Sequence, residues 1–272
     1  MNMHGHAARE LLAFYAEAGV DATVGEAPID RLSLTQINMP VAEPEPARQS
    51  VADAPARAAP AVARSGADGV AAPEAAVIAA REAARRAASL EELRAMLTGF
   101  EGCALRTTAK QLVFADGNPQ ARVMFVGEAP GREEDLEGLP FVGRSGKLLD
   151  RMMTAIGLNR TTAYIANIIP WRPPGNRTPT PQESQICLPF TLRQIELANP
   201  DILVCLGGPS AQTLLGVKEG IKRTRGKWFA FHTGTREIRA IATFHPAYLL
   251  RSPLEKRFAW RDFLAVKKAL EP

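Results

Sequence analysis

The sequence predicts an α/β protein, a three-layer α/β/α sandwich with a mostly parallel four-stranded central sheet, preceded by a helical and disordered N-terminal extension. Short runs of β-branched and apolar residues alternate with segments of helical periodicity in the C-terminal part of the 272-residue chain. Loops rich in glycine and proline follow these runs, and an Ala/Pro-rich stretch separates them from the N-terminal region. This alternation favours parallel strands, because the chain must cross over a face of the sheet between them, usually as a helix.

The N-terminal region is expected to hold a helical segment and a linker. Residues 7–18 place Leu11 and Tyr15 at helical spacing, within a helical segment that we take as 1–39. Residues 40–72 are rich in alanine and proline and poor in large apolar side chains, so they cannot bury enough surface to offset the entropy of ordering. We expect a flexible linker there. Helix 7–18 at its far end would either dock a protein partner or be an idle appendage.

Helical patterning resumes over 73–99, as a lead-in to a C-terminal domain that we expect over 100–272. Ser89, with Glu92 three residues later, forms a capping box that predicts a helix start. The expected strands are Arg122–Val126, Ala163–Ile168, Asp201–Leu206 and Ile238–Thr243, and the expected helices are Gly146–Ile156, Pro181–Ala198 and Pro209–Leu215. Functional side chains in such sheets collect on loops at the carboxyl ends of the strands, so four loops become candidates for a site.

Charge is divided unevenly along the chain. Residues 1–100 hold 9 Lys and Arg against 13 Asp and Glu, a net −4, whereas residues 101–272 hold 24 against 16, a net +8. A basic domain suits a polyanion such as DNA, because neutralised phosphates release counterions, although a merely soluble basic surface explains the same charge. The sequence has no signal-peptide layout and no apolar run near the roughly 20 residues of a membrane span. Its 3 widely spaced cysteines make no disulfide framework, so we expect a cytoplasmic protein. We also expect a monomer that does not associate with membranes.

The first candidate loop runs from Gly127 to Leu149 and reads GEAPGREEDLEGLPFVGRSGKLL. Its glycines let the backbone turn sharply and approach a ligand closely. A Gly/Pro-rich loop between a strand and a helix is by itself a weak signal, more often a structural turn or a generic phosphate cradle. The ordered series GEAPG, EED, PFVG, SG and LL is a much more specific signal, because chance agreement with a known motif over so many positions is very unlikely.

The other three loops carry an asparagine, a glycine pair and a histidine. Asn167 ends a strand before the basic, proline-rich RPPGNR, where a lone asparagine is usually a turn former, although its amide can also accept from and donate to the edge of a nucleobase. The loop at 206–212, LGGPSAQ, is either a phosphate cradle or a tight helix-entry turn. FHPAYLLR at 244–251 contains a histidine, which in isolation is more often structural than catalytic.

These motifs resemble the family 4 uracil-DNA glycosylases. The GEAPG to LL phrase and the late HP motif followed by AYLLR are the two principal motifs of that resemblance, which covers residues 100 to about 262. It implies a uracil-DNA glycosylase-like catalytic domain over 100–272 and a DNA-repair enzyme as a whole. The enzyme would flip uracil out of DNA and hydrolyse its N-glycosidic bond, leaving an abasic site. Its partner would be DNA containing uracil.

The resemblance also assigns roles to residues. His245 would stabilise the negative charge that grows on uracil O2, as an oxyanion hole does. Phe141 would stack on the base, Asn167 would select it, and Glu134 would line its C5 side and disfavour the methyl group of thymine. The further substrate-binding positions are Gly127 and Ala129. The DNA-binding positions are Arg172, Arg177, Tyr248, Leu249, Leu250 and Arg251, of which Tyr248, Leu249 and Leu250 would wedge into the space that the flipped base leaves.

The source of the attacking water is open. Ala129 stands where other branches of the superfamily place an acid, and alanine cannot act as a base. Glu128 is the second expected catalytic residue, and it either positions water or holds the loop by accepting backbone N–H bonds. Another branch bonds covalently to DNA through a histidine in a basic insertion. The basic stretch of this chain, KEGIKRTRGKW at 218–228, contains no histidine, which argues against covalent trapping.

The metal centre is where this sequence departs from the resemblance. Family 4 members typically hold a 4Fe–4S cluster on four cysteines. Cys103 and Cys187 match two of these ligands, whereas Phe100 and Trp171 replace the others. Two thiolates cannot hold such a cluster, so we expect no metal and no other cofactor. We expect these side chains to form one apolar plug on the site of the cluster, the alternative being that they lie apart on the surface.

Two other functions stay open. The protein could recognise uracil in DNA without turnover, or it could be a doubly wound small-molecule enzyme that uses GEAPG as a phosphate loop. The basic domain, the HPAYLLR segment and the lack of a GxGxxG or Walker-type sequence count against the second. Excision from a uracil-containing oligonucleotide separates the first from an enzyme.

Overall fold

The computed structural model describes residues 73–271, so the expected helical segment 1–39 and linker 40–72 lie outside the described residues. The strands are β1 (Asp116–Gly117), β2 (Val123–Gly127), β3 (Tyr164–Asn167), β4 (Ile202–Leu206), β5 (Trp228–His232) and β6 (Glu237–Thr243). The longer helices are α2 (Pro73–Arg86), α3 (Leu90–Gly99), α6 (Arg144–Ala155), α7 (Pro181–Ala198), α8 (Gly208–Leu215) and α11 (Lys256–Leu270). The short ones are α4 (Leu105–Thr108), α5 (Arg132–Glu137), α9 (Ile221–Thr224), α10 (Pro246–Arg251) and the 3₁₀ turns η1 (Pro174–Asn176) and η2 (Pro253–Glu255).

The strands form one sheet in the order β1-β3-β2-β4-β6-β5. The four expected strands are its parallel centre, β3-β2-β4-β6, which confirms that part of the prediction. Two antiparallel edge strands were not predicted: β1 pairs with β3, and β5 pairs with β6. β1 has only 2 residues, and four of the five residues of β5 are not buried, so neither shows the apolar run of a central strand.

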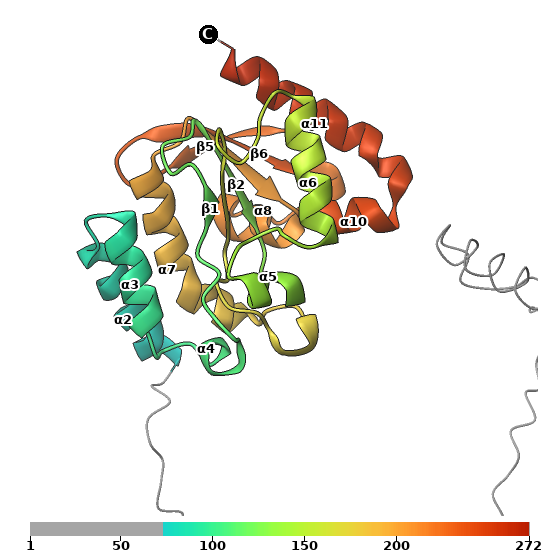
Figure 1. The fold of residues 1–272 in the computed structure, drawn as a ribbon. Coiled ribbons are helices and arrows are strands. Elements are labelled where there is room, and N and C mark those ends of the chain that lie inside the picture. Colours follow the sequence, from blue (N-terminus) through green and yellow to red (C-terminus); the bar gives the residue numbers. More distant parts are fainter. Residues whose placement is uncertain (1–72, 272) are drawn as a thin grey trace, which may run out of the picture. The chain divides into compact units, whose positions relative to one another are not determined.

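Both faces of β2, β3 and β4 are buried, so these strands read as nearly continuous apolar runs. On β2, Val123 and Phe125 join the core on one face, while Met124 and Val126 join the core on the other. Helices α6 and α11 cover the first face, and α7 with α2 and α3 covers the second (Figure 1). The three layers therefore match the expected sandwich.

The lead-in at 73–99 packs on α7 and shares its core. α2 presents buried alanines, among them Ala76, Ala80 and Ala84, whose small side chains let two helices approach closely. Ser89 caps α3 as expected, since its hydroxyl accepts from the Glu92 amide at 3.2 Å and the Glu92 carboxylate accepts from the Ala88 amide at 2.7 Å.

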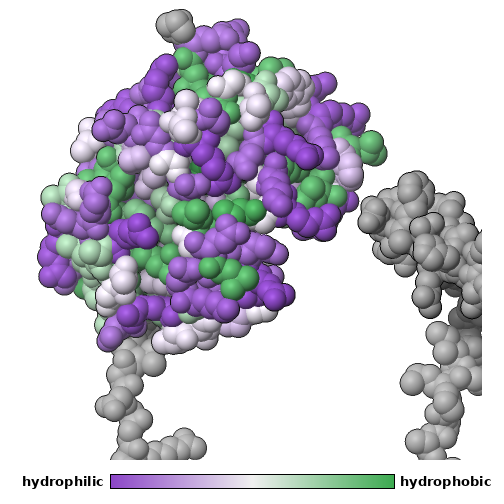
Figure 2. All heavy atoms as spheres, in the orientation of Figure 1, coloured by the Kyte–Doolittle hydropathy of each residue, from purple (hydrophilic) through white to green (hydrophobic). Residues whose placement is uncertain are grey.

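The face of the molecule shown in Figure 2 is mainly hydrophilic. Hydrophobic residues reach it only in small groups set between hydrophilic ones on the face shown in Figure 2. Within residues 73–271, no helix combines the length and the apolar character needed to cross a bilayer. The carboxyl ends of the four parallel strands lead into the four loops singled out in the sequence, and a site forms there.

Candidate active site

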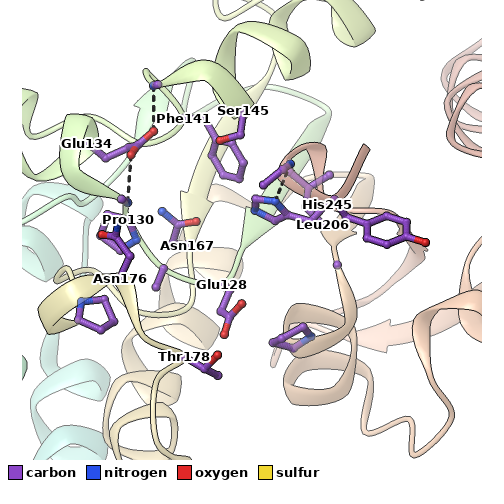
Figure 3. Close-up of a pocket in the computed structure, with 18 of the residues that line it drawn as sticks. Glu128, Pro130, Glu134, Phe141, Ser145, Asn167, Asn176, Thr178, Leu206 and His245 are labelled. Carbon is purple, nitrogen blue, oxygen red and sulfur yellow. Dashed lines mark hydrogen bonds between the residues drawn. The ribbon is translucent and has the colours of Figure 1, made fainter. Parts of the chain in front are cut away.

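A pocket of about 900 Å³ opens at the carboxyl ends of the parallel strands. All four candidate loops line it, with Glu128, Phe141, Asn167 and His245 among the lining residues. These side chains lie around one space although they are spread over more than a hundred positions of the chain (Figure 3). The expected convergence of the four residues is therefore confirmed. The volume is large enough for a pyrimidine with its sugar.

Phe141 forms one wall of the pocket and is 4% exposed. Its backbone has a φ of 56°, a left-handed conformation that costs a non-glycine residue about 1–2 kcal/mol. Two glycines make room for it. A Cβ on Gly127 would lie 2.6 Å from the tip of the Phe141 ring, and one on Gly146 would lie 1.7 Å from the Phe141 carbonyl oxygen. These glycines are needed for close approach, as the loop composition indicated.

Asn167 brings an unpartnered polar atom to the pocket. It is the last residue of β3, pairs with Gly127 in the sheet and is 4% exposed. Within residues 73–271, its Oδ1 is the one buried side-chain oxygen or nitrogen without a hydrogen-bond partner. Burying an acceptor without a donor costs free energy, so this oxygen is arranged for an N–H group from a ligand.

His245 is the N-cap of α10, and its Nδ1 accepts from the amide of Ala247 at 3.1 Å. That bond places the ring proton on Nε2, which leaves an N–H donor for the pocket. Burial, with a smaller contribution from Arg251, lowers the pKa of His245 to about 4, so the imidazole is neutral at pH 7. The His245 and Phe141 ring centroids lie 5.5 Å apart.

Glu128 follows β2 directly and is half-buried. Burial raises the pKa of its carboxyl group, and no hydrogen bond or charge within residues 73–271 offsets that effect. The carboxylate therefore does not hold the loop by accepting backbone N–H bonds, which favours the other interpretation, that it positions water. Neighbouring Ala129 lines the same pocket.

Glu134 lies in the pocket wall with its carboxylate already engaged. One oxygen accepts from the amides of Val142 at 3.0 Å and Gly143 at 2.9 Å, and the other accepts from Gly131 at 3.0 Å (Figure 3). The acid thus joins the start of α5 to the residues just before α6. Both of its carboxylate oxygens are used in these bonds, so Glu134 forms part of the pocket wall and its carboxylate is already hydrogen-bonded within the protein.

The basic residues after β3 are held by neighbours. Arg172 donates from Nε to Asn176 Oδ1 at 2.7 Å and lies outside the pocket lining. Arg177 lines the pocket and forms a two-pronged pair with Glu183 of α7, at 2.9 and 2.6 Å. Glu183 also caps α7 through the Thr180 amide at 2.7 Å, so this loop is anchored to the helix behind it.

The expected apolar wedge needs one correction. Leu249 is 0% exposed and packs against Phe244 and Ala259, so it belongs to the core and does not reach DNA. Tyr248, Leu250 and Arg251 line the pocket, and Leu250 is 37% exposed. Successive residues of a helix point about 100° apart, so the turn that buries Leu249 directs its neighbours outward.

Several pocket residues had no assigned role. Ser145 comes from the first loop, Thr178 from the loop after β3, and Leu206 from the end of β4. Each lies inside or beside a segment that the sequence singled out, and position after a strand is the signal that would have found them. Gly207 also lines the pocket, with a φ of 94° that makes the third loop a tight helix entry.

The residues at the expected cluster site do not fit a 4Fe–4S cluster. Cys103 and Cys187 are buried with their Sγ atoms 3.9 Å apart, and Trp171 is 2% exposed in the same apolar cluster. Phe100 packs on that cluster, with its ring edge-on to Phe190 at 5.0 Å between centroids. No group of three or more His, Cys, Asp or Glu residues in the described part of the chain is placed to hold a metal. Cys103, Trp171 and Cys187 are buried in one core and Phe100 packs against it, so the alternative of scattered surface residues is wrong. Direct contact of Phe100 and Trp171 with the two cysteines, as a single plug requires, stays a prediction.

Comparisons with known proteins agree with this geometry. The family model of the uracil DNA glycosylase superfamily matches residues 114–264. The type-4 uracil-DNA glycosylase of Archaeoglobus fulgidus is 40% identical over 179 residues, which are 64% of this chain and 90% of the relative. The one from Thermotoga maritima is 44% identical over 151 residues, 55% of this chain and 77% of the relative. The one from Saccharolobus solfataricus is 41% identical over 173 residues, 62% and 80% respectively.

The matched region contains all the loops that line the pocket, from Glu128 to Arg251. The lead-in at 73–99 lies outside it, although it packs on the same core. From the motifs, the fold and the comparisons together, this chain belongs to the uracil-DNA glycosylase superfamily and, within it, to the type-4 uracil-DNA glycosylases.

Proposed function

We propose that this protein excises uracil from DNA by hydrolysing its N-glycosidic bond and leaving an abasic site. The observation that carries the proposal is the buried, unpartnered Oδ1 of Asn167 in the pocket. Uracil N3–H would supply the missing donor, while the Asn167 amide would donate to uracil O4. Cytosine carries no proton on N3 and would leave that oxygen unsatisfied, at a cost of about 1–3 kcal/mol.

A flipped uracil would lie against the ring of Phe141, whose apolar face accepts any flat base. Asn167 would then select among bases that stack equally well. The backbone at Gly127 and Ala129 completes this part of the wall. Stacking on Phe141 would hold any flat base, and hydrogen bonds to Asn167 would select uracil, which explains why an aromatic and an amide side chain line the same pocket.

Bond cleavage leaves positive charge on the sugar and negative charge on uracil. The Nε2–H of neutral His245 would donate to uracil O2, where that negative charge grows. Glu128, as a carboxylate without a protein donor, would hold the attacking water and face the positive sugar. Each group acts in the transition state more than in the ground state, which is how it would accelerate the reaction.

We propose that DNA lies across the mouth of the pocket. Arg177 and Arg251 line the pocket and would contact phosphates together with Arg172, while Tyr248 and Leu250 would fill the space of the flipped base. We further propose that the protein is a cytoplasmic monomer without a cluster. The incomplete cysteine set and the packed side chains at that site support the absence of a cluster. Residues 7–18, for which either a partner-docking segment or an idle appendage is expected, lie outside the described residues.

The direct test is excision from a labelled single-stranded oligonucleotide with one uracil, read after alkaline cleavage of the abasic site. We expect cleavage at uracil and none at cytosine in the same position. Asn167→Ala should lose excision while folding normally, because it removes the selecting amide, whose oxygen has no hydrogen-bond partner in the protein. Binding to the uracil oligonucleotide without cleavage would instead show a recognition module.

A further inference from the structure

The peptide between Phe141 and Val142 is held from both ends by opposite charges. Phe141 carries the pocket's aromatic wall on a left-handed backbone, with a φ of 56°, that its own side chain disfavours. Among residues 73–271, the other residues besides glycine that have a positive φ are two asparagines, Asn176 and Asn199. Asparagine tolerates this conformation better than phenylalanine. Something outside Phe141 must therefore hold its turn in place.

On the N–H side the charge is the carboxylate of Glu134. It accepts from the amides of Val142 and Gly143, the two that follow Phe141, at 3.0 and 2.9 Å. Its second oxygen accepts from Gly131 and so ties the turn to the start of α5. Glu134 is 6% exposed, so water competes little for these bonds.

On the carbonyl side the charge is the guanidinium of Arg160, which lies outside every motif singled out in the sequence. Arg160 donates to the carbonyl of Phe141 and to that of Pro140 at 3.1 Å. It is itself anchored by Asp116 of β1 and Asp150 of α6, at 2.5 and 2.9 Å. The edge strand β1 and helix α6 thereby fix the guanidinium behind the pocket wall.

We propose that Arg160 and Glu134 are positioning residues of the uracil pocket, which hold the Phe141 ring in stacking position before the base arrives. The proposal rests on the proposed function, because it takes uracil as the ligand that Phe141 stacks on. A wall held in advance saves the cost of ordering the loop at each encounter. Glu134 then acts through Phe141 and not by touching the C5 side of the base.

The test compares Arg160→Lys and Arg160→Met with wild type in single-turnover excision and in inhibition by free uracil. Lysine keeps the charge but cannot span two carbonyls and two carboxylates as the planar guanidinium does. We expect excision to fall roughly 10- to 100-fold and inhibition by free uracil to weaken in parallel, with methionine worse than lysine. Affinity for an oligonucleotide that already carries an abasic site should stay unchanged, because it contains no base to stack.

Arg122→Met is the matched control. Arg122 also joins a carboxylate, Asp201 at 2.7 Å, and a carbonyl, Leu270 at 2.8 Å, but it stands before the amino end of β2, away from the pocket. Its loss should lower the melting temperature without changing excision or inhibition by uracil. If the Arg160 variants lower only the melting temperature as well, Arg160 is structural and the proposal is overturned.

Glu134→Gln and Glu134→Ala separate positioning from base exclusion. Glutamine retains one oxygen for Val142 and Gly143 but cannot accept from Gly131, so it should lose less excision than alanine. Neither variant should excise thymine. Full uracil excision with new thymine excision would show that Glu134 excludes the methyl group directly and would overturn the proposal. Wild type without excision would refute the proposed function itself, a result distinct from both.

Discussion

Replacing His245 tests the proposed chemistry most directly, because the structure separates two roles of this side chain. Nδ1 caps α10 by accepting from Ala247, and Nε2–H is left for the pocket. His245→Ala removes both. His245→Asn keeps a side-chain oxygen suited to an N-cap and removes only the donor that reaches the base. The pair of variants therefore distinguishes loss of the cap from loss of the charge-stabilising group.

The expected magnitudes follow from those two contacts. Loss of one oxyanion-stabilising donor slows chemistry by about 10²- to 10³-fold, or about 2.7–4 kcal/mol, so both variants should show that deficit. Loss of the cap costs about 1 kcal/mol of stability, which only His245→Ala should show. In a body of this size that is a drop of about 2–4 °C in melting temperature.

The pH dependence gives a second measure. Burial lowers the pKa of His245 to about 4, so the imidazole stays neutral above about pH 5 and its titration should not appear in the excision rate between pH 5.5 and 8. Single-turnover excision against pH, beside a titration of DNA affinity and a thermal melt, measures all three effects. An inflection near pH 6.5 that disappears in the His245 variants would refute a neutral donor. Unchanged chemistry with collapsed DNA binding would refute the role altogether.

Three further predictions concern the acid, the cluster site and the N-terminal region. Burial raises the pKa of Glu128, and its carboxylate is the active form. The excision rate should therefore rise with pH through that raised pKa and reach a plateau. Glu128→Gln should excise slowly, at a rate that does not change with pH over the same range. Purified protein should contain no stoichiometric iron by elemental analysis and show no visible absorbance. Trp171→Ala should lower the free energy of unfolding by about 3–5 kcal/mol in urea, because Trp171 is 2% exposed in the core. Deleting residues 1–72 should leave the excision rate intact, and a large loss would show that they belong to the active fold.

Much of the site was accessible from local sequence. Strands buried on both faces appear as apolar runs, and in a parallel sheet their carboxyl ends meet at one edge, so Glu128, Phe141, Asn167 and His245 could be assigned to one pocket before any coordinates. The replacement of two cysteines by Phe100 and Trp171 likewise predicted apolar packing, and Trp171 is buried in the core against which Phe100 packs.

The sequence by itself determined the layer order, the central strands and the loops that line the pocket, because these depend on periodicity and on motifs that are contiguous in the chain. Only the tertiary structure decided that Leu249 faces the core, that β1 and β5 extend the sheet, and that Arg160 holds the turn of Phe141. A helix phase, an edge-strand pairing and an ion pair between distant segments each depend on which elements pack together. A local sequence pattern does not contain that information, because the same residues could pack or pair with more than one other element of the fold.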